Sequence, residues 1–122
     1  MLDLDRQKEA LENIDKALLF VEETGERWPL AELYRLKGEV LISKEQPDYP
    51  AAESCFQTGL EIATAQGAKL FVLRILLLLA RHQKHFPQLP LARSQLESVY
   101  AEFTEGFSHR DLQEVSEFLS EY

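Results

Sequence analysis

Residues 52–60 read AESCFQTGL, and this stretch decides the fold because its pattern occurs three times along the chain. A small residue, Ala52, precedes Phe56 by four positions, and a glycine follows three positions further on. Residues 10–18, ALENIDKAL, and residues 92–100, ARSQLESVY, repeat this order of small, large, and small or medium side chains. Such a stripe is typical of a helix that packs closely on another, because the small residues allow the approach and the large one fills the groove.

A glycine follows each copy of the stripe. Gly25, Gly67 and Gly106 lie 15, 15 and 14 residues after the first small residue of their copies. Glycine at this place favours the end of a helix, because it enters the left-handed backbone region without strain. The copies begin 42 and 40 residues apart. An internal period of roughly 20–50 residues is typical of solenoids, so the chain is predicted to be an array of helical hairpins.

Helical periodicity also extends over the rest of the chain, and alternation of period two is nearly absent. Ser108 and Asp111 come close to a helix-capping pattern. The apolar run LFVLRILLLLA, residues 70–80, is too short to span a bilayer, so we expect it to be buried between helices. We expect six helices, over residues 4–23, 29–43, 50–67, 68–85, 90–105 and 109–120.

The predicted fold is all-α, a right-handed α-solenoid of helical hairpins with about six helices and a C-terminal capping helix. We expect a single domain over residues 1–122. Its expected parts are the second helix of an incomplete repeat (4–24), two repeats (28–67 and 68–106) and the capping helix (108–121).

The first helices of the two full hairpins carry a further pattern. YRLKG at 34–38 and LLLLA at 76–80 precede the second and third copies of the stripe. With the stripe itself, they resemble the tetratricopeptide (TPR) repeat, W-x2-L-G-x2-Y followed by A-x3-F. Lys37 stands where the pattern has Leu, and Leu41 and Gln83 stand where it has Tyr. The resemblance implies a helical-hairpin solenoid.

Three longer stretches of the sequence resemble a particular group of TPR-containing proteins. EETGERWPLAELYRLKGEVL, AAESCFQTGLEIATAQGAKLFVLR and YAEFTEGFSHRDLQEVSEFL are similar to the C-terminal TPR region of large bacterial signalling proteins. In those proteins a cyclase or DNA-binding domain and a predicted STAND-type ATPase precede the repeats. The resemblance covers residues 8–122 and implies a cytoplasmic regulatory or partner-sensing role. It implies no ATPase activity for this chain, which has no G-x4-G-K-[ST] loop.

The balance of acidic and basic residues limits the classes of partner that the chain is expected to bind. The chain has 21 acidic and 13 basic residues and a formal charge of −8, which argues against nucleic acid as a partner. From Ile62 to Leu96, however, there is no acid and there are five bases. We therefore expect a protein or peptide partner, with an acidic one as the favoured chemistry, and no membrane partner.

The bases Arg74, Arg81 and Lys84 are spaced to share one face of the fourth helix. By the resemblance, the first helices of the pairs line the concave surface, so Arg35 and Glu39 are expected on the same side. Two interpretations remain open: a solvated helix face, or a basic groove for an acidic peptide or a neighbouring domain.

The N-terminal helix lacks a hairpin partner of its own, so its apolar stripe predicts self-association. We expect a homodimer through this helix, with head-to-tail contact as the alternative. The residues of the stripe are Ala10, Leu11, Ile14, Ala17, Leu18 and Val21.

We expect no catalytic, cofactor-binding or metal-binding residues. His82 and His85 lie three apart, but no acid or cysteine between Glu61 and Glu97 completes a metal site, so solvated histidines are favoured. Cys55, the one cysteine, is expected to be a buried small hydrophobe. The expected function is a non-catalytic interaction or regulatory scaffold. A structural oligomerisation unit is the alternative, and a small metal-binding protein or enzyme is a remote one.

Overall fold

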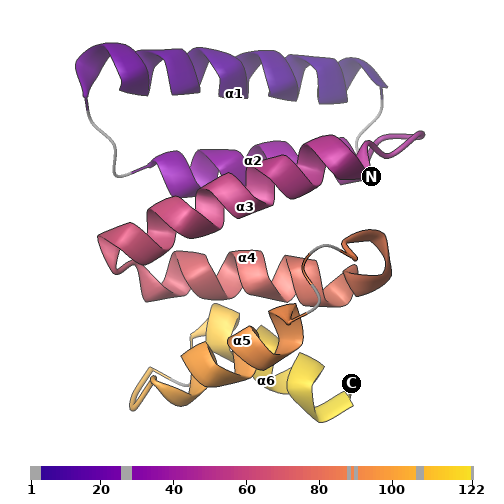
Figure 1. The fold of residues 1–122 in the computed structure, drawn as a ribbon. Helices are drawn as coiled ribbons and strands as arrows, with labels where there is room; N and C mark the ends of the chain where they lie inside the picture. The colour runs from indigo at the N-terminus through magenta and orange to yellow at the C-terminus, as the bar shows by residue number, and fades with distance from the viewer. Residues whose placement is uncertain (1–3, 26–28, 88, 90, 107–108, 122) are drawn as a thin grey trace. The chain divides into compact units, whose positions relative to one another are not determined.

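A computed structural model describes residues 4–25, 29–87, 89, 91–106 and 109–121 of the chain. Within these residues the protein is all-α, as expected, and contains no strand (Figure 1). The chain forms two compact units, unit 1 (Met1–Gln66) and unit 2 (Gly67–Tyr122). The helices of unit 1 are α1 (Leu4–Thr24), α2 (Leu30–Ile42) and α3 (Tyr49–Gln66), and unit 2 contains α4 (Lys69–Arg81), the 3₁₀ turn η1 (Gln83–His85), α5 (Ala92–Ala101) and α6 (Arg110–Glu121).

In unit 1, α2 packs against both α1 and α3, and consecutive helices run in opposite directions (Figure 1). The AESCFQTGL stretch supplies the α3 side of this core, because Ala52 and Phe56 are fully buried and Gly59 is buried. Phe56 lies against Gly38 of α2, where an added Cβ would come within 2.7 Å of Phe56 Cζ. The close packing of α2 on α3 therefore requires that Gly38 has no side chain.

Unit 2 is built around α4, which packs against both α5 and α6. From Val72 to Leu79 every residue of α4 is buried except Arg74 and Leu78, as expected for a helix that is apolar on nearly every side. The largest fully buried side chains of this unit are Leu73, Ile75, Leu76, Leu79, Phe86, Leu96 and Val115.

The three copies of the stripe differ in burial. In the third copy Ala92 and Leu96 belong to the core of unit 2. In the first copy Ala10, Ile14 and Ala17 of α1 are only half-buried. The inward stripe is thus fully formed in α3, largely formed in α5, and partly formed in α1.

Two helices are shorter than expected. The fourth helix ends at Arg81 and not at residue 85, and the chain turns through η1 instead. Pro87 then prevents helical backbone from continuing past η1, because it disfavours helical backbone at Phe86, which has φ −127° and ψ 61°. The fifth helix spans only Ala92–Ala101. Beyond it, the Phe103 N–H donates to the Tyr100 carbonyl three residues before it, which is the hydrogen bond of a 3₁₀ turn.

The three glycines predicted to close helices all have positive φ, at 76° for Gly25, 70° for Gly67 and 78° for Gly106. The first two directly follow α1 and α3, as expected. Gly106 lies beyond the end of α5, so it turns the chain toward α6 and does not terminate α5 itself. The predicted capping residue Ser108 lies outside the described residues.

Candidate functional site

The basic residues predicted to share one binding face differ in whether an acid pairs with them. On α2, Arg35 donates to Glu32 one turn before it, and its Nη1 lies 3.0 Å from Glu39 Oε2 one turn after it. The local acids therefore neutralise the charge of Arg35, and Glu39 is used by the same cluster. Both residues belong to unit 1. They form a helix-surface network of pairs three and four residues apart, which stabilises the helix modestly.

Arg74 connects two helices of unit 2. Its Nε donates to Asp111 Oδ2 of α6 at 2.8 Å, and its guanidinium lies 5.6 Å from the centre of the Phe71 ring. Asp111 also lies 3.6 Å from His109 Nδ1. Asp111 is also the residue that the capping pattern pairs with Ser108, which lies outside the described residues. The side chain of Arg74 thus has a structural partner between α4 and α6.

Arg81 and Lys84 remain as exposed bases that form no ion pair within the described part of the chain. Arg81 is the last residue of α4, and Lys84 lies in η1. Arg81 lines a pocket of about 460 Å³, here called the cationic pocket, in unit 2. The lining residues of the cationic pocket are Ala80, Arg81, Gln83, Arg93 and Phe118.

Arg93, in the first turn of α5, also lines the cationic pocket. Its Nη2 donates to the Leu119 carbonyl at 3.2 Å, its Nε lies 3.2 Å from Glu97 Oε1, and its guanidinium lies 5.6 Å from the centre of the Phe118 ring. These contacts fix the guanidinium at the pocket. The sequence showed Arg93 as one base of the acid-free segment, but nothing in it indicated that α5 and α6 bring Arg93 onto Phe118.

Gln83 holds the turn that follows α4. Its Nε2 donates to the carbonyls of Phe86 at 3.1 Å and Leu89 at 2.8 Å. The Oε1 atom of the same amide is buried and accepts no hydrogen bond among the described residues. Gln83 thereby shapes the wall of the cationic pocket. Sequence reasoning treated Gln83 only as a departure from the TPR pattern.

His82 lies next to the cationic pocket and is half-buried. Burial lowers the pKa of His82 below its usual 6.5, and the nearby His85 and Arg81 lower the pKa further. The imidazole is therefore mostly neutral at pH 7. The positive charge at this end of unit 2 that no acid pairs with among the described residues comes from Arg81 and Lys84, because Arg93 pairs with Glu97.

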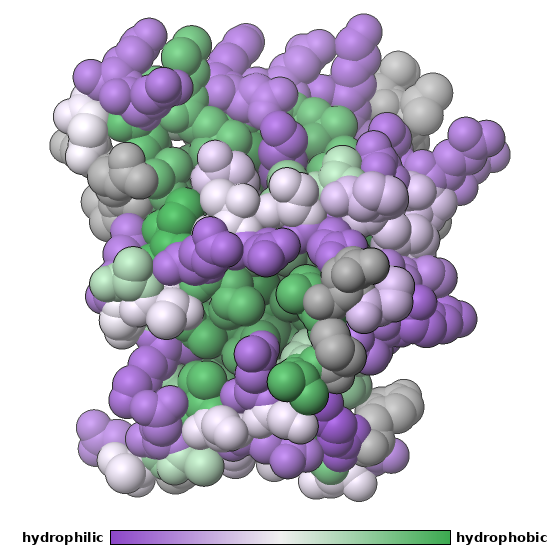
Figure 2. Space-filling model, in the orientation of Figure 1, coloured by the Kyte–Doolittle hydropathy of each residue, from purple (hydrophilic) through white to green (hydrophobic). Residues whose placement is uncertain are grey.

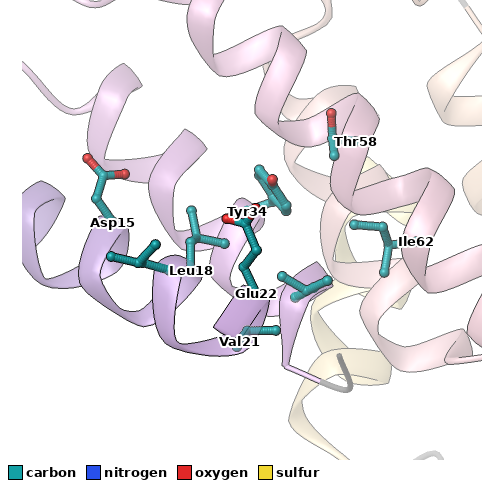
Figure 3. A pocket seen from close by; sticks show the side chains of 9 residues that line it. Asp15, Leu18, Val21, Glu22, Tyr34, Thr58 and Ile62 are labelled. Atoms are coloured by element: carbon teal, nitrogen blue, oxygen red, sulfur yellow. The ribbon is translucent and has the colours of Figure 1, made fainter. Parts of the chain in front are cut away.

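Unit 1 has a separate groove of about 790 Å³, here called the α1 groove (Figure 3). Figure 3 shows Leu18 and Glu22 of α1 facing Tyr34 of α2, with Ile62 of α3 on the other side. Its nine lining residues are Asp15, Leu18, Leu19, Val21, Glu22, Leu30, Tyr34, Thr58 and Ile62.

Within α1, the residues predicted for self-association are partly covered by the rest of unit 1. Val21 is 4% exposed, and Ala10, Leu11, Ile14, Ala17 and Leu18 are half-buried. Two other side chains of α1 are much more exposed, Leu19 at 54% and Phe20 at 59%. Hydrophobic side chains are visible among hydrophilic ones along α1, the helix at the top of Figure 1 (Figure 2).

An ion pair joins α1 to α2 beside the α1 groove. Lys37 Nζ donates to Asp15 Oδ1 at 2.9 Å. This hydrogen bond is the largest cause of a raised pKa for Lys37. Cys55 is buried in α3, as expected, and burial raises the pKa of its thiol. The thiol is therefore protonated at neutral pH and packs as a small apolar side chain.

A search of the described residues finds no group of three or more His, Cys, Asp or Glu side chains arranged to hold a metal ion. The same part of the chain contains no helix with the length and apolar character needed to cross a membrane. Comparisons of the chain with protein-family models, curated proteins and solved structures find no match.

Proposed function

We propose that this chain is a non-catalytic protein-interaction module of a cytoplasmic signalling system, and that the cationic pocket of unit 2 binds an acidic segment of a partner protein. The observation that carries the proposal is the composition of the pocket lining: Arg81 and Arg93 both line it, and none of the acids in the described part of the chain does. Arginine is suited to this task because its planar fork of donors matches a carboxylate.

The contacts of the two arginines give them different roles. Arg93 is held by the Leu119 carbonyl, the Phe118 ring and an ion pair with Glu97, so little side-chain entropy is lost when it meets a ligand, but an acidic ligand competes with Glu97. Arg81 is exposed at the end of α4 and supplies charge without a competing ion pair in the described residues. Lys84 extends the positive field beyond the pocket. Because these groups remain close to water, we expect micromolar affinity that falls as salt is added.

The proposed architecture is a right-handed TPR-like stack of helical hairpins. Its support is the stripe of AESCFQTGL, which recurs with a period of 40 to 42 residues, and the contact between Gly38 and Phe56 at the α2–α3 crossing. In such arrays each hairpin contacts its neighbours, so a peptide site on one hairpin is compatible with a regulatory role in a larger assembly.

Affinity measurements with a labelled peptide rich in Asp and Glu test this function. Arg81→Glu combined with Lys84→Glu should weaken binding at least about tenfold, because reversed charges repel the acidic peptide. Lys69→Glu combined with Arg110→Glu changes the net charge equally at exposed sites outside the pocket and should have a much smaller effect. Equal losses in the two double variants would refute a localised site.

Self-association through α1 is the second candidate function, favoured by the exposed Leu19 and Phe20. Apolar burial of about 25 cal/mol per Å² supplies the drive, and the loss of rigid-body freedom opposes it. Sedimentation over a concentration series distinguishes the candidates. A dimer that Ile14→Glu dissociates supports an interface through α1, whereas a monomer at about 100 µM excludes the expected affinity.

A further inference from the structure

We propose that the α1 groove of unit 1 binds a basic amphipathic helix of a partner protein, in addition to the acidic segment proposed for unit 2. The volume of about 790 Å³ falls within the roughly 300–1,000 Å³ that is usual for ligand sites. Three helices contribute to its walls, so the groove belongs to the packed structure of the unit. The inference rests on the apolar lining, the acids beside it and the charge of unit 1.

The lining is mainly apolar. Leu18 and Val21 of α1 line the groove together with Leu30 of α2 and Ile62 of α3. Leu19 also lines the groove and is 54% exposed, so unit 1 itself leaves this side chain half open to solvent. Such a surface is suited to the apolar face of a helix, which places anchors at spacings of three, four and seven residues.

Two acids stand among the apolar residues. Asp15 and Glu22 are seven residues apart, two turns along α1, and both line the groove. Lys37 already pairs with Asp15, whereas Glu22 is exposed and forms no ion pair within the described residues. The Tyr34 hydroxyl, also without a hydrogen-bond partner in that part of the chain, adds a polar contact point.

The charge of the whole unit has the same sign as these acids. Residues 1–66 contain 14 acidic and 7 basic side chains, a net charge of −7, whereas residues 67–122 carry −1. A basic helix is therefore attracted to the groove both by Glu22 locally and by unit 1 as a whole. Pairing this surface with its own copy would bring two charges of −7 together, which disfavours a symmetric dimer through the groove.

The test uses a labelled amphipathic helix of leucine and lysine, with a leucine–glutamate helix of the same pattern as the opposite-charge probe. Glu22→Lys and Leu19→Asn should each weaken binding of the lysine helix about fivefold or more, since one removes charge attraction and the other removes an apolar contact. Adjacent residues outside the lining give matched controls. Glu23→Lys and Phe20→Asn should keep the affinity within about twofold.

Several outcomes would overturn the inference. Equal binding of the two helices would show that charge does not select the ligand. Equal losses in variants and controls would place the contact outside the groove. A dimer of the free protein that Leu19→Asn dissociates and Phe20→Asn does not would identify a second copy as the occupant. Arg81→Glu with Lys84→Glu should not weaken the lysine helix, so this proposal and the proposed function can fail separately.

Discussion

Gly38 of α2 and Phe56 of α3 fit together so closely that a Cβ on Gly38 would lie 2.7 Å from Phe56 Cζ and 2.8 Å from Phe56 Cδ1. Phe56 is fully buried and Gly38 is buried, so neither side of the contact opens to solvent. The ring occupies the space that a side chain at Gly38 would need. This relationship explains why the two helices approach closely at the AESCFQTGL stretch.

Gly38→Ala should therefore destabilise the protein. Overpacking costs about 1–3 kcal/mol, and the higher helix propensity of alanine returns up to about 1 kcal/mol. Urea unfolding measures the net loss, with the exposed Ser54→Ala on α3 as a control that should change stability by less than about 0.5 kcal/mol. In a Phe56→Leu background the loss from Gly38→Ala should shrink by at least about 0.5 kcal/mol. An unchanged loss would mean that the ring is not the obstacle.

The Arg74–Asp111 pair should hold α4 to α6 without taking part in ligand binding. A double-mutant cycle of Arg74→Gln and Asp111→Asn should give a coupling of about 0.5–1 kcal/mol, since both side chains are only half-buried and solvent screens them. The exposed pair Arg110–Glu114 should give a smaller coupling. Arg74→Gln should leave the affinity for the acidic peptide within about twofold. A tenfold loss of affinity would show that Arg74 takes part in binding.

His82 makes the free energy of unfolding depend on pH in the acidic range. Its folded pKa lies below 6.5, mainly because burial disfavours the charged imidazole, so the unfolded chain takes up the proton more readily. The stability linked to His82 is thus fully present above the unfolded value and is lost as the pH falls through the folded pKa. His82→Gln should lose less stability than the parent between about pH 7.5 and about pH 5. Identical losses in unfolding experiments at those two pH values would contradict this assignment.

Parts of the fold could be predicted because they depend on local periodicity. The stripe around Phe56 predicted which residues of α3 face inward, and Gly25 and Gly67 predicted where α1 and α3 end. The end of α4 at Arg81 was not predicted, because Pro87 restricts only Phe86, the residue before it, and the expected helix already stopped at residue 85.

The candidate site was less predictable, since it depends on contacts between distant residues. Arg74 and Arg81 lie on α4, whereas Lys84, expected on the same helix, lies in η1. No local signal pairs Arg74 with Asp111, 37 residues away. The contact of Arg93 with Phe118 also joins two residues that are far apart in sequence. Arg35 is different, because Glu32 and Glu39 stand three before and four after it, a spacing that predicts neutralisation from the sequence alone.

Mapping by NMR the amide chemical-shift changes that the acidic peptide causes tests the central claim most directly. We expect the largest changes at Arg81, Gln83 and Arg93 and at the nearby Phe118, with saturation at micromolar peptide and weaker binding as salt is added. The amides of α1 should change little. Changes spread evenly over the basic residues, or centred in unit 1, would contradict a localised acidic-segment site at the cationic pocket.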